Sequence, residues 1–405
     1  MKIENYLSQL QVHLRNKTAI EMASLLNIAF LPKSLKMSLA KQPLMPKSIL
    51  PEEWLNISSL HLKAAVAYSD GNYEEAFKHQ REVLLQVQKL FASTDSWILP
   101  VVHVASEDLW RCAQQNKPPK ANDDSWKEEA SRLINRSFNI SLNDRSGKED
   151  ASSRKMGVFR LINLLFRIYY DLDQLNLCHN LLKVLKNTQL PALDLFPKAH
   201  LCTFHYFHGR TLLISGKFQD ALLELEASLF LCSNKSERNA LLLLELIVPL
   251  KILVQSQRPP LVIQAKLPAY IKDLVRAIAV GDYERYFGIL ESNSGRLYAL
   301  GSMFAWQRLG LFCRRNAILR IFNLFNRNTR LPFSSFAPAF YTSSLNNATN
   351  SDEQQQPKEE FIIATFVSLI GCGLIKAYAA LEKKFVVFSA KDPFPTNIPA
   401  SYLFP

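Results

Sequence analysis

Four histidines in one region of the sequence are the residues best suited to hold a metal ion. His205 and His208 lie three positions apart in a predicted helix, and His179 and His200 precede them. Imidazole nitrogens at such helical spacings are common zinc ligands. No carboxylate or cysteine stands at a spacing that would complete a known ligand set. We therefore predict no metal site, and interpret these residues as helix histidines packed against aromatic neighbours.

The chain lacks the short motifs that mark phosphate or acyl-transfer chemistry. It has no G-x-x-x-x-G-K-[ST] loop, no G-x-G-x-x-G fingerprint and no G-x-S-x-G elbow, and Gly371 and Gly373 follow a predicted helix instead of preceding one. The six cysteines are scattered without a C-x-x-C pair, and "MKIENYLSQL" does not resemble a secretory leader. We predict an intracellular protein that is not an enzyme, with reduced thiols, no catalytic residues, no cofactor and no small-molecule substrate.

Basic residues in the last third of the chain are the candidates for binding a polyanion. Five arginines fall within 17 residues that contain no Asp or Glu, and three lysines follow further along. Such groups contact phosphates without reading a base sequence. Since five arginines cannot share one helix face, we expect some of them to pair with carboxylates or with a partner subunit. The candidates for sequence-tolerant contact with RNA or DNA are Arg314, Arg315, Arg320, Arg327, Arg330, Lys376, Lys383 and Lys384.

The composition favours a mainly helical protein with a sizeable core. Of the 405 residues, 48% are hydrophobic and only 12 are glycine, and the apolar residues recur mostly at intervals of three or four. The formal charge of +12 and the pI near 9.3 favour acidic partners at low salt. Two apolar runs, 240–254 and 361–375, are too interrupted or too short to span a membrane. We interpret them as buried helices and predict no membrane partner.

A short turn motif recurs between predicted helices. It reads "GNYEEAF" at residue 71, "GKFQDAL" at 216 and "GDYERYF" at 281, with a looser version from Asp173. We expect each glycine to end a helix in a left-handed conformation, the aromatic residue to staple the next helix onto the first, and alanine to permit close approach. Helix pairs of this kind stack into an array. The residues assigned to the turns are Gly71, Tyr73, Ala76, Gly216, Phe218, Ala221, Gly281 and Tyr283.

The last ninety residues have the element order of a winged helix. A basic amphipathic helix, "RRNAILRIFNLFNRN", precedes a second segment opened by proline and interrupted at Pro338. A polar loop then leads to "EEFIIATFVSLIGCG", a helix with an acidic start and a glycine end. Two strand-like runs, "LIKAYAA" and "FVVFSAK", form a hairpin around "LEKK". Three helices followed by a two-stranded wing are therefore predicted.

These elements suggest a mainly α protein, a TPR-like helical-repeat solenoid followed by a C-terminal winged helix. The predicted divisions are an N-terminal helical segment (1–50), a helical-repeat domain (51–200), a second helical-repeat subdomain (201–313), the winged helix (314–391) and a proline-rich tail (392–405).

A helical-repeat array leading directly into a winged helix resembles the PCI domains, named after the proteasome lid, the signalosome and an initiation factor. The resemblance runs from about residue 50 to the end, and three blocks are most specific: 206–232, 246–260 and 374–395. They contain "YFHGRTLLISGKFQDALLELEASLFLC", "LIVPLKILVQSQRPP" and "LIKAYAALEKKFVVFSAKDPFP". These blocks are similar to the PCI subunit of the nuclear-pore-associated transcription and mRNA-export complex and to the signalosome subunit twelve-like proteins. The polar loop at 345–360 is longer than that family leads us to expect.

The resemblance implies a non-catalytic subunit that pairs with a large scaffold protein and a small acidic disordered protein. With the scaffold, it would form a nucleic-acid-binding platform for transcription-coupled mRNA export, in the nucleus at the nuclear envelope and pores. The alternative is a PCI subunit of a signalosome-like or proteasome-lid-like assembly without nucleic-acid binding.

Overall fold

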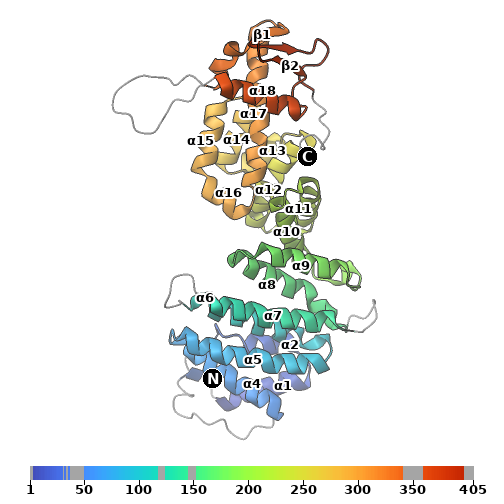
Figure 1. Cartoon of the computed structure of the whole chain (residues 1–405). Coiled ribbons are helices and arrows are strands. Elements are labelled where there is room, and N and C mark those ends of the chain that lie inside the picture. Colours follow the sequence, from blue (N-terminus) through green and yellow to red (C-terminus); the bar gives the residue numbers. More distant parts are fainter. Residues whose placement is uncertain are drawn as a thin grey trace, which may run out of the picture. The chain divides into compact units, whose positions relative to one another are not determined.

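The computed structural model describes residues 3–30, 32, 35–36, 50–116, 124–144, 152–340 and 359–395. These residues form helices throughout and one small sheet near the C-terminal end (Figure 1). The mainly α, helical-repeat architecture ending in a winged helix is therefore confirmed. The chain divides into two compact units, Met1–Phe207 and His208–Pro405. None of the helices in the described ranges combines the length and the apolar character that a membrane span requires.

The first unit consists of antiparallel helices that pack mainly against their neighbours in sequence, such as α4 on α5, α5 on α6 and α7 on α8. Each helix buries one apolar stripe, as stacking requires. Its α-helices are α1 (Ile3–Arg15), α2 (Ala19–Leu25), α4 (Glu52–Ser69), α5 (Tyr73–Ser93), α6 (Leu99–Gln115), α7 (Ser125–Leu142), α8 (Val158–Asp171) and α9 (Leu175–Lys186). Short 3₁₀ turns are η1 (Ser96–Ile98), η2 (Arg154–Gly157) and η3 (Leu193–Leu195), and α10 (Lys198–Ile214) continues into the second unit.

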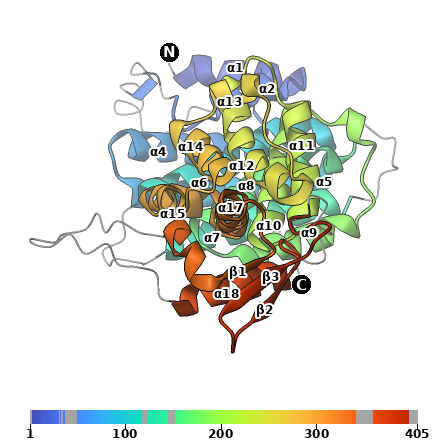
Figure 2. The ribbon, with the colours of Figure 1, turned by 90° about the horizontal axis from the view of Figure 1, so that it is seen from above.

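The second unit is built around one long helix, α17 (Met303–Leu324), which is seen end-on in Figure 2. Helices α12, α14 and α15 pack against it. The predicted boundary between residues 313 and 314 falls inside this continuous helix, so helical repeat and winged helix share it. The other helices are α11 (Phe218–Leu231), α12 (Glu237–Gln255), α13 (Leu261–Lys266), α14 (Ala269–Val280), α15 (Tyr283–Ser292) and α16 (Ser294–Leu300).

The winged helix follows the end of α17. Its elements are β1 (Arg330–Pro332), the 3₁₀ helix η4 (Phe333–Phe340), α18 (Glu359–Gly371), β2 (Ala377–Ala380) and β3 (Phe385–Phe388). The antiparallel sheet has the order β1-β3-β2, with Leu331 opposite Val386 and Ala379 also opposite Val386. Aromatic rings fill the space beneath the sheet: Phe322, Phe333, Phe336, Phe366 and Phe388.

The prediction of a two-stranded wing was wrong in one respect, because β1 adds a third strand. Three residues containing a proline give no alternating pattern, and β1 pairs only because the end of α17 brings it beside β3. The second helix of the motif is a 3₁₀ helix that contains Pro338, as the predicted interruption indicates. Most of the polar loop at 345–360 and of the tail at 392–405 lies outside the described residues, as does part of 1–50.

The recurring turns have the predicted left-handed glycines. Gly71, Gly216 and Gly281 have φ of +78°, +75° and +69°. In each turn the residue after the glycine donates its N–H to the carbonyl five positions earlier, which closes a Schellman motif. These bonds run from Asn72 to Ala67 (2.9 Å), from Lys217 to Leu212 (3.0 Å) and from Asp282 to Ala277 (2.9 Å).

The looser turn and one further turn follow the same rule. Asp173 has φ of +55°, and the N–H of Gln174 bonds to the carbonyl of Tyr169 at 2.8 Å. Gly301, which does not fit the predicted turn motif, has φ of +78° between α16 and α17. Its sequence "GSMFA" moves the aromatic residue one position along, which is why the pattern missed it.

The aromatic residues of the turns do not all staple the two helices they join. Tyr73 does so, because its ring lies 5.4 Å from that of Tyr68 on the preceding helix. Phe218 instead packs on Phe304 of α17, with ring centroids 5.6 Å apart. Tyr283 packs on the winged helix, at 5.5 Å from Phe340. In the second unit the aromatic residue thus links one helical layer to the next.

The alanines of the motif are fully buried, as close helix packing requires. Ala76 and Ala221 have no exposed surface. Where α10 meets α11, a methyl group placed on Gly209 would lie 3.2 Å from the carbonyl oxygen of Ala221 and 2.7 Å from Leu225. Small side chains on both helices therefore set the spacing of this pair.

Candidate partner and nucleic-acid interface

Arg314 is part of the internal packing of the winged helix. Its guanidinium lies over three rings, those of Tyr283 and Phe287 at 5.4 Å and that of Phe361 at 5.5 Å. The side chain is only half-exposed. A cation held against three aromatic faces stabilises the contact between α15, α17 and α18. We therefore remove Arg314 from the proposed contact surface.

Arg315 is a second internal arginine. Its guanidinium donates to the carbonyl oxygens of Leu374 (3.2 Å), Phe394 (3.0 Å) and Pro395 (3.2 Å). Burial lowers the pKa of this guanidinium, but Arg remains charged because its ordinary pKa is so high. The residue fastens the segment after β3 to α17, and we remove it from the contact surface as well.

The three remaining arginines are exposed. Arg320 donates to the carbonyl of Val280 at 2.9 Å, where it satisfies the C-terminal end of α14. Arg327 lies on the bend after α17, and its Nε donates to the side chain of Asn323 at 3.3 Å. Arg330 begins β1 and lies over the ring of Phe385 at 4.9 Å. Each keeps its charge toward solvent.

The lysines lie at the two ends of the hairpin. Lys376, just before β2, is 3.1 Å from Asp392, and Lys384, just before β3, is 2.8 Å from Glu359. Ion pairs at such exposed positions contribute little stability, about 0–1 kcal/mol, so a phosphate can compete for either lysine. Lys383 lies beside Lys384 in the turn and is exposed. The structure thus leaves six candidates exposed on the surface: Arg320, Arg327, Arg330, Lys376, Lys383 and Lys384.

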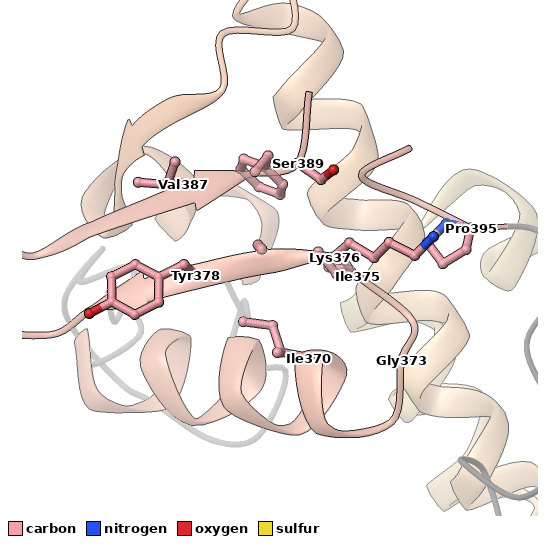
Figure 3. A pocket seen from close by; sticks show the side chains of 10 residues that line it. Ile370, Gly373, Ile375, Lys376, Tyr378, Val387, Ser389 and Pro395 are labelled. Carbon is pink, nitrogen blue, oxygen red and sulfur yellow. The ribbon is translucent and has the colours of Figure 1, made fainter. Parts of the chain in front are cut away.

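A groove of ≈ 760 Å³ runs along β2, between the sheet and the end of α18 (Figure 3). Tyr378 marks one end, and Lys376 and Pro395 mark the other, with Ile370 and Val387 between them. Because the sheet order places β2 at an edge, its outer N–H and C=O groups have no neighbouring strand in the described structure. The Tyr378 side chain is 70% exposed, and Leu381 beyond it is 54% exposed. An open edge beside exposed apolar side chains can accept an extended segment of another chain.

Sequence reasoning missed this groove and also missed Lys391, which follows the wing. The stretch "AYAA" gives one indication of the groove, since a single large aromatic residue among alanines in an edge strand must point to one face of the sheet. The position of Lys391 depends on how the chain turns after β3, and no local pattern encodes that turn.

The histidines considered as metal ligands have other neighbours. The ring of His200 lies edge-on to that of His103 at 6.4 Å, and Nδ1 of His179 is 3.0 Å from the carbonyl oxygen of Leu175. Nδ1 of His208 lies 3.1 Å from a carboxylate oxygen of Glu224. Across the part of the chain that the structure describes, no three His, Cys, Asp or Glu side chains group around a possible metal position.

A buried carboxyl group holds the N-terminal helices in the first unit. Asp108 on α6 has no exposed surface and accepts the backbone N–H of Ile28 at 2.9 Å, just after α2. Burial raises its pKa to about 7, although the Ile28 hydrogen bond and the neighbouring Arg111 act in the opposite direction. The contact between α2 and α6 thus depends on a group that titrates near neutral pH.

Fold and surface together define a helical-repeat protein that ends in a winged helix with an open sheet edge. No family model matches the chain. Protein CSN12 homolog of Schizosaccharomyces pombe is 30% identical to it over 370 residues, which are 86% of this chain and 84% of that protein. PCI domain-containing protein 2 homolog of Dictyostelium discoideum is 27% identical over 84% of this chain and 78% of its own length. PCI domain-containing protein 2 of Danio rerio is 25% identical over 86% of each chain.

The chain therefore belongs to the PCI-domain family that contains the CSN12 homologues and PCI domain-containing protein 2. Membership of this family implies that the chain works within a protein complex.

Proposed function

We propose that this chain is a non-catalytic scaffold subunit of a multi-subunit assembly of the signalosome type, and that it joins the assembly through its winged helix. The name CSN12 homolog, carried by the Schizosaccharomyces pombe relative, supports this class of assembly. It also agrees with the signalosome subunit twelve-like branch of the sequence resemblance.

The observation that carries the proposal is the open edge of β2 beside an apolar groove. Unpaired strand edges are normally blunted or covered in stable proteins, because they pair with other chains. Here the edge has an exposed Tyr378 and the groove contains Ile370 and Val387. A neighbouring subunit that adds a strand to β2 would satisfy the backbone groups and bury these side chains.

The test is affinity purification of the full-length chain from its own cells, followed by mass spectrometry. We expect signalosome-type PCI subunits to co-purify with the unmodified chain. The variant Tyr378→Asp should lose these partners, because an unpaired charge at the groove cannot be buried in an interface. Val367→Asp is the matched control, since Val367 is 53% exposed on α18 but does not line the groove. Unchanged partners for the Tyr378 variant would rule out this interface.

A second candidate function is favoured by the six exposed basic residues of the winged helix and the end of α17. In this role the chain would pair with a large scaffold protein and a small acidic protein, in the nucleus at the envelope and pores, and hold RNA or DNA during mRNA export. Phosphate-led contact needs exposed positive charge rather than base-reading side chains, and these six residues supply it.

Two measurements test this candidate. Salt-dependent binding of single-stranded RNA should weaken when Arg320, Arg327, Lys383 and Lys384 are changed to Glu. Recovery of neither an export-complex scaffold nor a small acidic protein from nuclear extract would reject the candidate, and fluorescence imaging checks the nuclear-envelope location.

A further inference from the structure

A second hollow, which shares Ser389 with the β2 groove, lies between the end of α17 and the segment after β3. Its volume is about 380 Å³, which is room for a group the size of one nucleotide. Arg327 and Lys391 contribute cations to its lining, and Asn323, Thr329 and Ser389 contribute an amide and two hydroxyl groups. Side chains distant in sequence thus surround one small space with hydrogen-bond donors.

The backbone around Arg327 is held in an unfavourable conformation. Asn326 and Arg327 have φ of +52° and +58°. Asparagine adopts this left-handed conformation readily, but at Arg327 it costs roughly 1–2 kcal/mol. A 2.9 Å bond from the N–H of Arg327 to the carbonyl of Phe322 fixes this bend. Strained residues of this kind concentrate at ligand-binding positions.

The orientation of Arg327 suits an anion. Its Nε donates to the Oδ1 of Asn323, so the two terminal nitrogens, which can grip two oxygens of one anion, have no acceptor among the described residues. Among the described residues that line the hollow, Asp392 has the single carboxylate, and Lys376 at 3.1 Å offsets its charge. Within the described ranges, neither Arg327 nor Lys391 has a carboxylate partner. The hollow is therefore positive.

We propose that this hollow binds one phosphate group of a single-stranded nucleic-acid backbone. A phosphate presents more acceptor oxygens than a carboxylate, so it can use the guanidinium, the ammonium and the hydroxyl groups together. The lining also contains Leu319 and Phe322, which suit an adjoining sugar. A flexible strand can place one phosphate inside a hollow, whereas a duplex presents its phosphates on rigid convex ridges. The inference deepens the second candidate function and rests on it.

The test is fluorescence anisotropy of a labelled oligouridine with the full chain, titrated with salt. The variant Arg327→Gln with Lys391→Gln should raise Kd about tenfold at low salt and reduce the slope of log K against log[salt] by about 0.7, the value for one phosphate of a single strand. The control is Lys217→Gln with Lys235→Gln, which removes the same charge at exposed positions outside the hollow. The control should change Kd by less than about twofold.

The outcomes separate the hollow from the wider candidate function. The hollow would be rejected as the binding site if the two double variants weakened RNA binding equally. It would also be rejected if the Arg327 and Lys391 variant left binding unchanged. In both cases nucleic-acid binding by the chain itself would stand. An unlabelled duplex that competes as well as the single strand would also reject it. Absence of binding by the unmodified chain alone would reject the hollow, and absence of binding by its complex with the scaffold protein would reject the nucleic-acid candidate.

Discussion

The turns at Gly71 and Gly281 have the same backbone and very different surroundings. Gly71 is exposed, and a methyl group placed on it would meet nothing within 4 Å. Gly281 is buried, and the same methyl group would lie 2.3 Å from the backbone nitrogen of Ala317 on α17. In the first unit, only the left-handed φ angle favours glycine at this position. In the second unit it also lets α17 lie directly against the turn between α14 and α15.

The two units differ in a second way, in the polar groups that fasten their ends. Asp108 holds the N-terminal helices through a carboxyl that titrates near neutral pH, whereas Arg315 holds the segment after β3 through a guanidinium that stays charged. The attachment of the N-terminal helices is thus sensitive to pH, whereas the attachment of the segment after β3 is not.

The largest effect is expected from Gly281→Ala. The substitution combines the left-handed strain with a clash against backbone, which cannot move aside as a side chain can, so we expect a loss of about 3 kcal/mol or more. Urea denaturation of the full chain measures it. A loss no larger than that of Gly71→Ala would mean that α17 does not need this close approach.

The second effect concerns pH. The folded pKa of Asp108, about 7, lies above its ordinary value of 3.8, so its stabilising contribution is complete below about pH 4 and is lost as the pH rises through 7. Between pH 5 and 7 the stability of the unmodified chain should fall relative to Asp108→Asn by up to about 1.4 kcal/mol per pH unit. Denaturation at both pH values tests this, with the exposed Asp70→Asn as control. A difference that does not change with pH contradicts the account.

Gly216→Val should have an intermediate effect. A methyl group at this position would lie 3.4 Å from the ring of Phe304, so crowding is mild, but a β-branched residue at φ of +75° is strained. We expect a loss of about 2 kcal/mol, with weaker recovery of partners in proportion. A variant that kept its melting temperature would show that the turn does not set the packing of α10 and α11.

Gly71→Ala should have the smallest effect, about 1 kcal/mol, since only the backbone conformation opposes it. Its thermal unfolding provides the reference for the other two glycines. If the loss matched that of Gly281→Ala, the left-handed backbone alone would account for both losses, and the contact of Gly281 with α17 would add nothing.

Much of the architecture could be predicted because local chemistry encodes it. A left-handed residue between helices favours glycine, so Gly71, Gly216 and Gly281 were visible in the sequence, and the order of elements after residue 314 indicated the winged helix. The strand β1 was not visible, because a three-residue strand takes its pairing from elements distant in sequence. For the same reason the destinations of the turn aromatics Phe218 and Tyr283 could not be predicted.

The candidate surface was harder to predict, because residue type does not reveal what a side chain contacts. Arg314 and Arg330 both lie over aromatic rings, yet one is enclosed by three of them and the other faces solvent. Arg315 lies next to Arg314 and is held by backbone carbonyls instead. Which basic residues stay exposed, and that Lys391 lies near Arg327, becomes clear only from the fold, which places the end of α17 beside the segment after β3.

Helix α17 has 22 residues, a rod about 33 Å long that belongs to the repeat at its start and to the wing at its end. A wing excised at residue 314 would lose half of this rod and the aromatic partners of Arg314 on α15. The winged helix of this chain is therefore not an independent structural unit. A fragment grafted onto another protein would have to include α14, α15 and the whole of α17.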